Sequence, residues 1–286
     1  MVRCWGTRGS IPSPGPDTAR YGGNTSCVEI VAGPRHLIFD AGSGVRALGS
    51  SLLEAAAPVK TTIFLTHFHW DHIQGLPFFP PLYDEQTCLD IVGPIQYTPD
   101  GRELDVESLF AGQMGPIYFP VPMSAVSAAC SFGHLNEGVW EEDGIRVSAM
   151  RVRHPSWVVG YRIDFGGHRI AYVPDNELDP DAAYPMGAEW RARFVEFLGD
   201  VDILLHDAMY TAEEYPSRTL WGHSTFSQAV EVADEAGVRE LAFFHHDPMR
   251  TDAELDEIVA RHADAALAAG RTVKIRAAAE GAKILS

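Results

Sequence analysis

The run His67-Phe68-His69-Trp70-Asp71-His72 brings three imidazoles and one carboxylate close together in the chain. His67 and His69 lie two positions apart, so on an extended loop their side chains point to the same side and can bind one metal ion. Asp71 and His72 continue the turn and can face a second ion beside it. Imidazole and carboxylate suit a zinc-like divalent metal, and paired ions are a known hydrolytic arrangement. A polar surface loop is the plainer alternative, but this run directly follows a buried, strand-like segment, which favours the metal site.

Three other histidine or aspartate residues come after strand-like segments later in the chain. His154 follows residues 147–153, Asp175 follows residues 169–173, and His245 follows residues 241–244. Taken singly, a histidine or aspartate at the end of a strand is explained equally well by exposure to solvent. The residues alone therefore do not identify them as ligands, and their assignment to a metal site rests on the resemblance of the whole pattern to a known family.

The pattern His-x-His-x-Asp-His resembles the signature of the metallo-β-lactamase superfamily. The resemblance implies two divalent metal ions, Zn²⁺ with Mn²⁺ as the alternative. It implies the following ligand set: His67, His69 and His154 on one ion, Asp71, His72 and His245 on the other, and Asp175 between them. Only one of the adjacent His245 and His246 can be the final ligand. Pro248 matches the proline of related sequences and favours His245.

A second motif narrows the resemblance to the ribonuclease Z-related branch, which includes cyclic phosphodiesterases. Trp221-Gly222-His223-Ser224-Thr225 precedes a predicted helix, as the corresponding histidine does in that branch, and residues 4–10 and 21–26 are also similar. This implies that His223 assists cleavage of a phosphodiester and that Asp71 orients or deprotonates the attacking water. The alternative is that His223 only neighbours a helix cap. The resemblance to this branch covers nearly the whole chain.

Two departures from relatives limit the choice of substrate. The long Gly- and Pro-rich arm with which transfer-RNA-processing members hold RNA has no basic counterpart here, and the formal net charge is −17. Such a charge repels polyanions, so no stable nucleic-acid partner is expected. His69 stands where diiron redox members carry glutamate, which disfavours electron transfer.

The elements that must position these residues can be read from hydrophobic periodicity and turn residues. Residues 27–31 and 36–39 form a predicted hairpin around Gly33-Pro34, residues 45–57 a helix ended by Pro58, and residues 61–66 a buried strand. Residues 77–122 are Pro-rich and are expected to be loops. Further strands are predicted at 147–153, 161–165, 169–173, 201–205 and 241–244, with helices from Ser224 to Gly237 and from Thr251 to Gly270.

Strands and helices alternate near both ends, which indicates helices packed outside a sheet core. With the family resemblance, we expect an α+β fold in which residues 1–286 form one αββα sandwich of two mixed β-sheets flanked by helices. Asp40, in Phe39-Asp40-Ala41-Gly42, matches an aspartate that the family carries beside the metal loop, and the resemblance implies that it orients a ligand histidine. His206-Asp207 is left open between a pair that lines the site and a buried hydrogen-bonded pair.

Composition gives the cellular setting. The four scattered cysteines indicate reduced thiols, and neither a signal peptide nor a membrane-spanning stretch is evident. We therefore predict a soluble, cytoplasmic protein with no membrane partner. The sequence itself does not indicate an oligomeric state, but related proteins are often dimers, so the resemblance makes a homodimer possible.

The predicted function is metal-dependent hydrolysis of a small or cyclic nucleotide-like phosphodiester. A thioester, lactone or β-lactam hydrolase on the same site is the first alternative, although it has no obvious use for His223. A mononuclear iron dioxygenase, as in some relatives, is the second. A non-catalytic metal-binding protein is the third, and the complete ligand set argues against it.

Overall fold

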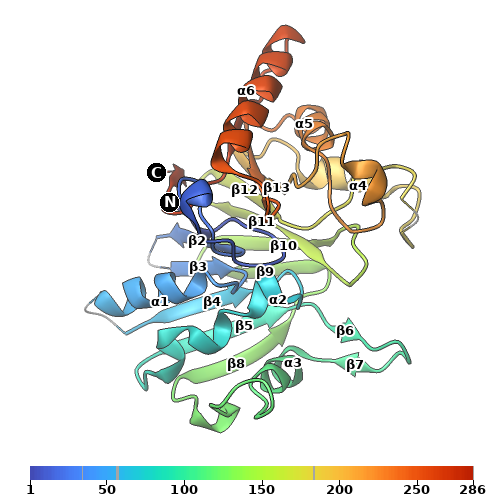
Figure 1. Cartoon of the computed structure of the whole chain (residues 1–286). Coiled ribbons are helices and arrows are strands. Elements are labelled where there is room, and N and C mark those ends of the chain that lie inside the picture. Colours follow the sequence, from blue (N-terminus) through green and yellow to red (C-terminus); the bar gives the residue numbers. More distant parts are fainter. Residues whose placement is uncertain (34, 56–57, 183, 286) are drawn as a thin grey trace.

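Two seven-stranded sheets form the centre of the computed structural model, which describes residues 1–33, 35–55, 58–182 and 184–285 (Figure 1). The first sheet has, in order, β16 (Lys283–Leu285), β1 (Val2–Gly6), β2 (Cys27–Ala32), β3 (Arg35–Phe39), β4 (Lys60–Phe64), β5 (Cys88–Gly93) and β8 (Ala129–His134). The second has β15 (Lys274–Ala277), β14 (Glu240–Phe244), β13 (Ile203–Asp207), β12 (His168–Val173), β11 (Val159–Phe165), β10 (Ile145–Arg151) and β9 (Gly138–Glu142).

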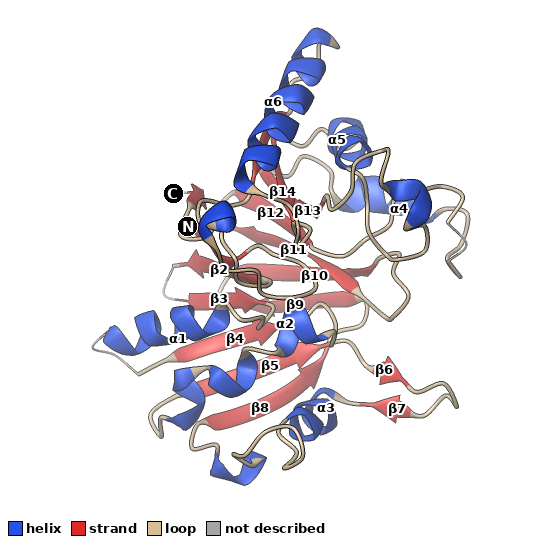
Figure 2. Cartoon of the chain, in the orientation of Figure 1, coloured by secondary structure: helices blue, strands red, loops and turns tan. Residues whose placement is uncertain are grey.

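Helices cover the outer face of each sheet (Figure 2). Helices α1 (Val45–Glu54) and α3 (Val106–Gln113) belong to the half of the first sheet, and α4 (Trp190–Phe197), α5 (Phe226–Glu235) and α6 (Asp252–Ala268) to the half of the second. One apolar cluster lies between the sheets, with Phe39, Phe64 and Tyr161 in mutual ring contact. A separate apolar cluster lies under each helical layer. The predicted αββα sandwich is thereby confirmed. That it is a single domain stays a prediction.

Both sheets are mixed, and their parallel strands create the edge on which chemistry can be built. Strands β3, β4, β5 and β8 run parallel, as do β12, β13, β14 and β15. The carboxyl ends of parallel strands lie at one edge of a sheet, so the residues that follow them gather there. The short helix α2 (Trp70–Ile73) follows β4 at this edge.

Several predicted boundaries differ from the structure. The predicted loops at 77–122 contain β5, the ribbon of β6 (Gln96–Tyr97) and β7 (Glu103–Leu104), and helix α3. Asp105 caps α3 by accepting from the Ser108 backbone N–H. Helix α5 is capped by Thr225 rather than Ser224, because Thr225 forms a capping box with Gln228. The predicted start of a helix at Thr251 is confirmed, and Thr251 forms a capping box with Glu254 on α6.

Two predicted boundaries lie partly outside the described residues, since the expected turn includes Pro34 and the expected helix end includes residues 56–57. None of the helices in the described parts of the chain is both long and apolar enough to cross a membrane.

Candidate metal centre

The first group of metal donors combines residues from both sheets. His67, His69, His154 and Asp175 each offer a ligand atom within 4.8 Å of the others. His67 and His69 follow β4, whereas His154 follows β10 and Asp175 follows β12. His67 Nε2 lies 3.7 Å and His154 Nε2 3.9 Å from Asp175 Oδ2, and His154 Nε2 lies 3.3 Å from His69 Nδ1.

The second group lies on the other side of Asp175. Asp71, His72 and His245 form it, and all three are buried. Asp71 Oδ2 lies 3.1 Å from His245 Nε2 and 3.3 Å from His72 Nε2. Asp175 Oδ1 lies 3.1 Å from His72 Nε2 and 3.4 Å from His245 Nε2. The two oxygens of Asp175 therefore face different donor groups, as a bridging carboxylate would.

These donor sets fit divalent metal ions. A tetrahedral zinc site with bonds of about 2.0–2.1 Å has ligand atoms about 3.4 Å apart, close to most of the separations above. Among the described residues, the buried atoms His67 Nε2 and Asp175 Oδ1 have no hydrogen-bond partner. A buried polar atom without a partner is costly, and a bound cation would satisfy both atoms. The structure thus brings together all seven residues that the sequence nominated as ligands, while their role as ligands stays a prediction.

The ring nitrogens that face away from the centre are held by fixed acceptors. His72 Nδ1 donates to Asp40 Oδ2 at 2.8 Å, and His154 Nδ1 donates to the Gly222 carbonyl oxygen at 3.0 Å. Thr66 Oγ1 lies 3.0 Å from His67 Nδ1. Such contacts set the tautomer and leave the opposite nitrogen free for a metal. Asp40 therefore contacts a candidate ligand histidine, His72, in the way that its expected orienting role requires.

The pKa values of the histidines are shifted in opposite directions in the two donor groups. Burial lowers the pKa of His154 to about 3 and that of His67 well below its usual value, so both are neutral and ready to bind a cation. Burial would also lower the pKa of His72, but Asp175, Asp71 and Asp40 outweigh it and raise that pKa well above its usual value. The second group therefore concentrates negative charge that a cation would neutralise.

His223 lies beside the donor groups and is paired with Asp207. Its ring stacks on that of His245 at 4.9 Å and meets His154 edge-on at 5.5 Å. His223 Nδ1 donates to Asp207 Oδ2 at 2.8 Å. Burial lowers the pKa of His223, but the Asp207 carboxylate outweighs it and raises that pKa to about 9.

In each of the adjacent pairs His206-Asp207 and His245-His246, the two side chains point to different surroundings. Asp207 contacts His223, whereas His206 Nδ1 donates to the Asp207 carbonyl oxygen, away from the donor groups. His245 lies among the donors, whereas His246 Nε2 donates to the Ala278 carbonyl oxygen. In each pair, therefore, only one residue faces the site.

Comparison with known proteins identifies the family of this chain. A model of the β-lactamase superfamily domain matches residues 35–246. The chain belongs to this superfamily. It is 29% identical to a ribonuclease Z of Lactococcus lactis subsp. cremoris (strain MG1363), over 67% of this chain and 72% of that protein.

Solved structures share the superfamily fold with this chain. A structure described as a new diphosphatase from the PhnP family has a TM-score of 0.68 at 18% identity, over 100% of this chain and 97% of that one. The short form of human tRNase Z has a TM-score of 0.60 at 18% identity, over 86% of this chain and 92% of that one. The predicted resemblance to a superfamily hydrolase related to ribonuclease Z is confirmed.

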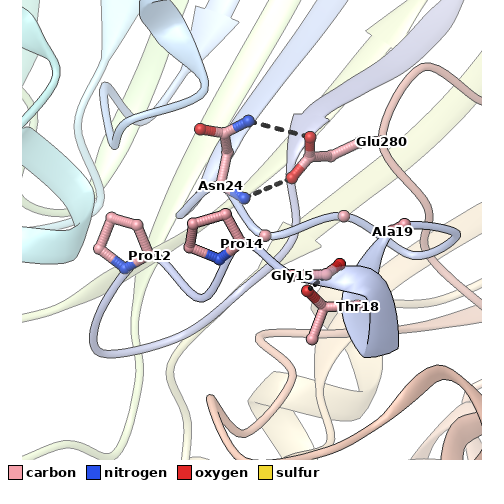
Figure 3. Close-up of a pocket in the computed structure, with 9 residues that line it drawn as sticks. Pro12, Pro14, Gly15, Thr18, Ala19, Asn24 and Glu280 are labelled. Atoms are coloured by element: carbon pink, nitrogen blue, oxygen red, sulfur yellow. Dashed lines mark hydrogen bonds between the residues drawn. The ribbon is translucent and has the colours of Figure 1, made fainter.

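The loop that precedes β2 contacts the candidate metal centre, although the resemblance of residues 4–10 and 21–26 to the family gave it no role there. The Ser10 backbone N–H donates to Asp71 Oδ2 at 2.7 Å, and an added Cβ on Gly9 would overlap the His245 ring. Asn24 fastens the loop to the C-terminal segment by donating to both oxygens of Glu280 (Figure 3). Because Ser10 acts through its backbone, its side-chain type carried no signal.

Glu177 is the second residue that sequence reasoning missed. It follows β12, two positions after Asp175, and is fully buried. Its carboxylate accepts hydrogen bonds from two tyrosine hydroxyls and from two backbone N–H groups of the loop before His223. Its sequence surroundings contain no motif that marks it.

Proposed function

We propose that this chain is a dinuclear metal-dependent phosphodiesterase that hydrolyses a small or cyclic nucleotide-like phosphodiester. The observation that carries the proposal is the placement of Asp175 between two donor groups, with His223, paired with Asp207, beside both. Zinc is the proposed metal, with manganese as the alternative, because imidazole and carboxylate donors suit both. Two such ions would acidify a water and neutralise the charge of the phosphate oxygens.

The residues of the chain supply the remaining steps. Asp71, held by the Ser10 N–H, would orient the attacking water through its carboxylate. His223 would donate its proton to the departing ester oxygen, for which a raised pKa and the Asp207 partner suit it at neutral pH. Asp207 would keep the His223 ring oriented with Nε2 free for this transfer.

Turnover of bis(p-nitrophenyl) phosphate by protein of measured metal content tests the proposal. We expect hydrolysis at two ions per chain, loss of both metal and activity in His67→Ala, and slow turnover with metal retained in His223→Ala. His168→Ala is the matched control, because His168 is an exposed histidine on β12. An unchanged rate in His223→Ala would refute the role of that residue.

The same preparation distinguishes the other reactions. A nitrophenyl ester and a chromogenic β-lactam test carbonyl hydrolysis, and their turnover without diester cleavage would replace the proposal. One iron per chain with consumption of oxygen would instead indicate a dioxygenase.

RNA is the second candidate substrate, because the curated relative named above is a ribonuclease Z. The net charge of −17 weighs against tight binding of a polyanion. Cleavage of a 3′-extended transfer-RNA precursor at a higher kcat/KM than any small diester would establish the RNA reading. A cytoplasmic location and a homodimer stay predictions.

A further inference from the structure

An apolar hollow of about 480 Å³ lies against the helix that carries two of the candidate metal ligands. Four aromatic residues line it: Trp70, Phe78, Tyr118 and Phe119. Phe78 and Phe119 pack edge to face at 5.2 Å, whereas Trp70 is 73% and Tyr118 74% exposed. Exposed aromatic rings around a hollow are typical of a binding site rather than of core packing.

The hollow and the candidate metal centre share the short helix α2. Trp70 and Ile73, the first and last residues of α2, line the hollow, and Asp71 and His72 between them face the metal donors. Gln113 Nε2 donates to the Ile73 carbonyl oxygen at 2.7 Å and so fixes α3 against α2. The hollow and the donor groups are therefore neighbours along this one short helix.

The lining also defines the chemistry of the occupant. Among the described residues that line the hollow there is no Asp, Glu, Lys, Arg or His, so it offers no ionic partner to a phosphate group or another charged group. Flat aromatic walls favour a planar ring that can stack on them. We propose that the hollow binds the uncharged aromatic ring, such as a nucleobase, of one arm of the phosphodiester. This inference rests on the proposed function and specifies its substrate class.

Binding of product-like monoesters by the metal-loaded protein tests this subsite without turnover. By isothermal titration, phenyl phosphate should bind about tenfold or more tightly than methyl phosphate, a range consistent with the stacking of one ring. Trp70→Ala and Tyr118→Ala should remove that preference and leave methyl phosphate binding unchanged. Leu267→Ala, which alters an exposed leucine on α6, is the matched control.

Three results are informative. Equal binding of the two monoesters would overturn the subsite even if diesters are hydrolysed. Phenyl preference in a protein that hydrolyses no diester would instead refute the proposed function alone. A Trp70→Ala protein that changes from dimer to monomer in sedimentation, with no phenyl preference in the wild type, would show that a second copy covers this face and would overturn the proposal.

Glu177 supports a second, independent inference. Glu177 Oε1 accepts from Tyr215 Oη at 2.5 Å and from the Leu220 N–H at 2.8 Å. Glu177 Oε2 accepts from Tyr184 Oη at 2.6 Å and from the Gly222 N–H at 2.8 Å. A buried carboxylate is costly unless its oxygens are satisfied, and here every donor comes from a hydroxyl or from the backbone.

The four bonds hold a loop whose backbone is unusual. Leu220 and Gly222 both adopt positive φ, at 67° and 90°, which is unfavourable for Leu220. Gly222 presents its carbonyl oxygen to His154 Nδ1, and His223 follows directly. The Glu177 backbone N–H also donates to the Arg153 carbonyl oxygen at 2.8 Å, next to His154. We infer that Glu177 is a positioning residue that sets the tautomer of His154 and the place of His223.

Glu177→Gln tests the inference because it keeps the shape of the side chain. The new NH₂ group would face either the Leu220 or the Gly222 N–H, so one backbone bond must break. Nitrogen NMR of the metal-free protein should then show His154 no longer protonated only at Nδ1. Zinc affinity, measured against a chelator, should fall about 10- to 100-fold, as for other residues that orient metal ligands, and kcat should fall with KM unchanged.

Tyr184→Phe is the matched control, since it removes one hydroxyl donor and keeps both backbone bonds. It should leave the tautomer and the zinc affinity as in the wild type. A Glu177→Gln protein that melts at a lower temperature but keeps both properties would show a merely structural role and overturn the inference. The tautomer of His154 and the zinc affinity are measured without turnover, so they test this inference even if the proposed function is wrong.

Discussion

Replacement of Asp40 by Asn should selectively weaken the second metal-donor group. Asp40 is fully buried at the end of β3, and its carboxylate accepts from the Thr66 backbone N–H at 2.8 Å, from Tyr172 Oη at 2.8 Å and from His72 Nδ1 at 2.8 Å. Asn can keep the bond from Thr66. Its NH₂ group would then face His72 Nδ1, which must become an acceptor and move its proton to Nε2, the atom that faces Asp71 and Asp175.

The size of the effect follows from that proton. A hydrogen bond to a charged group contributes about 1.5–3 kcal/mol. Loss of a residue that orients a metal ligand costs about 10- to 100-fold in affinity, or about 1.4–2.7 kcal/mol, so the two figures agree. We expect the dissociation constant of the second ion to rise by that factor. The first ion should be little affected, because His67 and His154 are oriented by other groups.

Competition with a chromogenic chelator measures both dissociation constants. Glu29→Gln is the matched control, because Glu29 bonds His36 Nδ1 at 2.7 Å at the other end of β3 and should leave both constants unchanged. An Asp40→Asn protein that is folded and binds two ions as tightly as the wild type would refute the reasoning.

Three further perturbations test other parts of the structure. Burial lowers the pKa of His206 to about 4, so as the pH falls the unfolded chain takes up a proton on this residue before the folded protein does. The contribution of His206 to the free energy of unfolding, about 3 kcal/mol, is therefore lost between about pH 6.5 and 4. In urea unfolding, His206→Gln should lose less stability than the wild type over that pH range. Gly222→Ala should lower metal content and cost about 1–3 kcal/mol in thermal unfolding, because the position has positive φ and an added Cβ would overlap His154 Nδ1; full metal content would contradict this. Burial raises the pKa of Cys4 to about 12, so a thiol reagent should modify the exposed Cys88 in the folded protein and reach Cys4 only in denaturant, as mass spectrometry would show.

The first candidate ligands could be predicted because their signal is local, since His67 to His72 occupy one short run. His154, Asp175 and His245 each follow a predicted strand, but only the family resemblance identified them as ligands. Asp40 was identified through the same resemblance. The αββα arrangement followed from alternating strands and helices together with the family resemblance.

The residues that were missed depend on contacts that no local pattern records. Glu177 is recognised only by its partners, up to 45 residues away, and Ser10 bonds Asp71 through its backbone from 61 residues away. Strand β5 and helix α3 were missed for another reason. Both are short segments between prolines and glycines, and the turn preference of those residues led to a prediction of loops. Strand β5 forms because it pairs with β4 and β8, which composition alone does not reveal.

The division of the ligands between the sheets couples metal binding to folding. Asp71 and His72 follow a strand of the first sheet, whereas Asp175 and His245 follow strands of the second, so neither donor group exists until the sheets pack. A ligand that binds only the folded state stabilises it by about 2.7 kcal/mol at a free concentration one hundred times its dissociation constant. Removal of the ions by a chelator should therefore lower the unfolding temperature of the wild type and do so much less in His67→Ala. An equal drop in both would mean that the ions bind elsewhere.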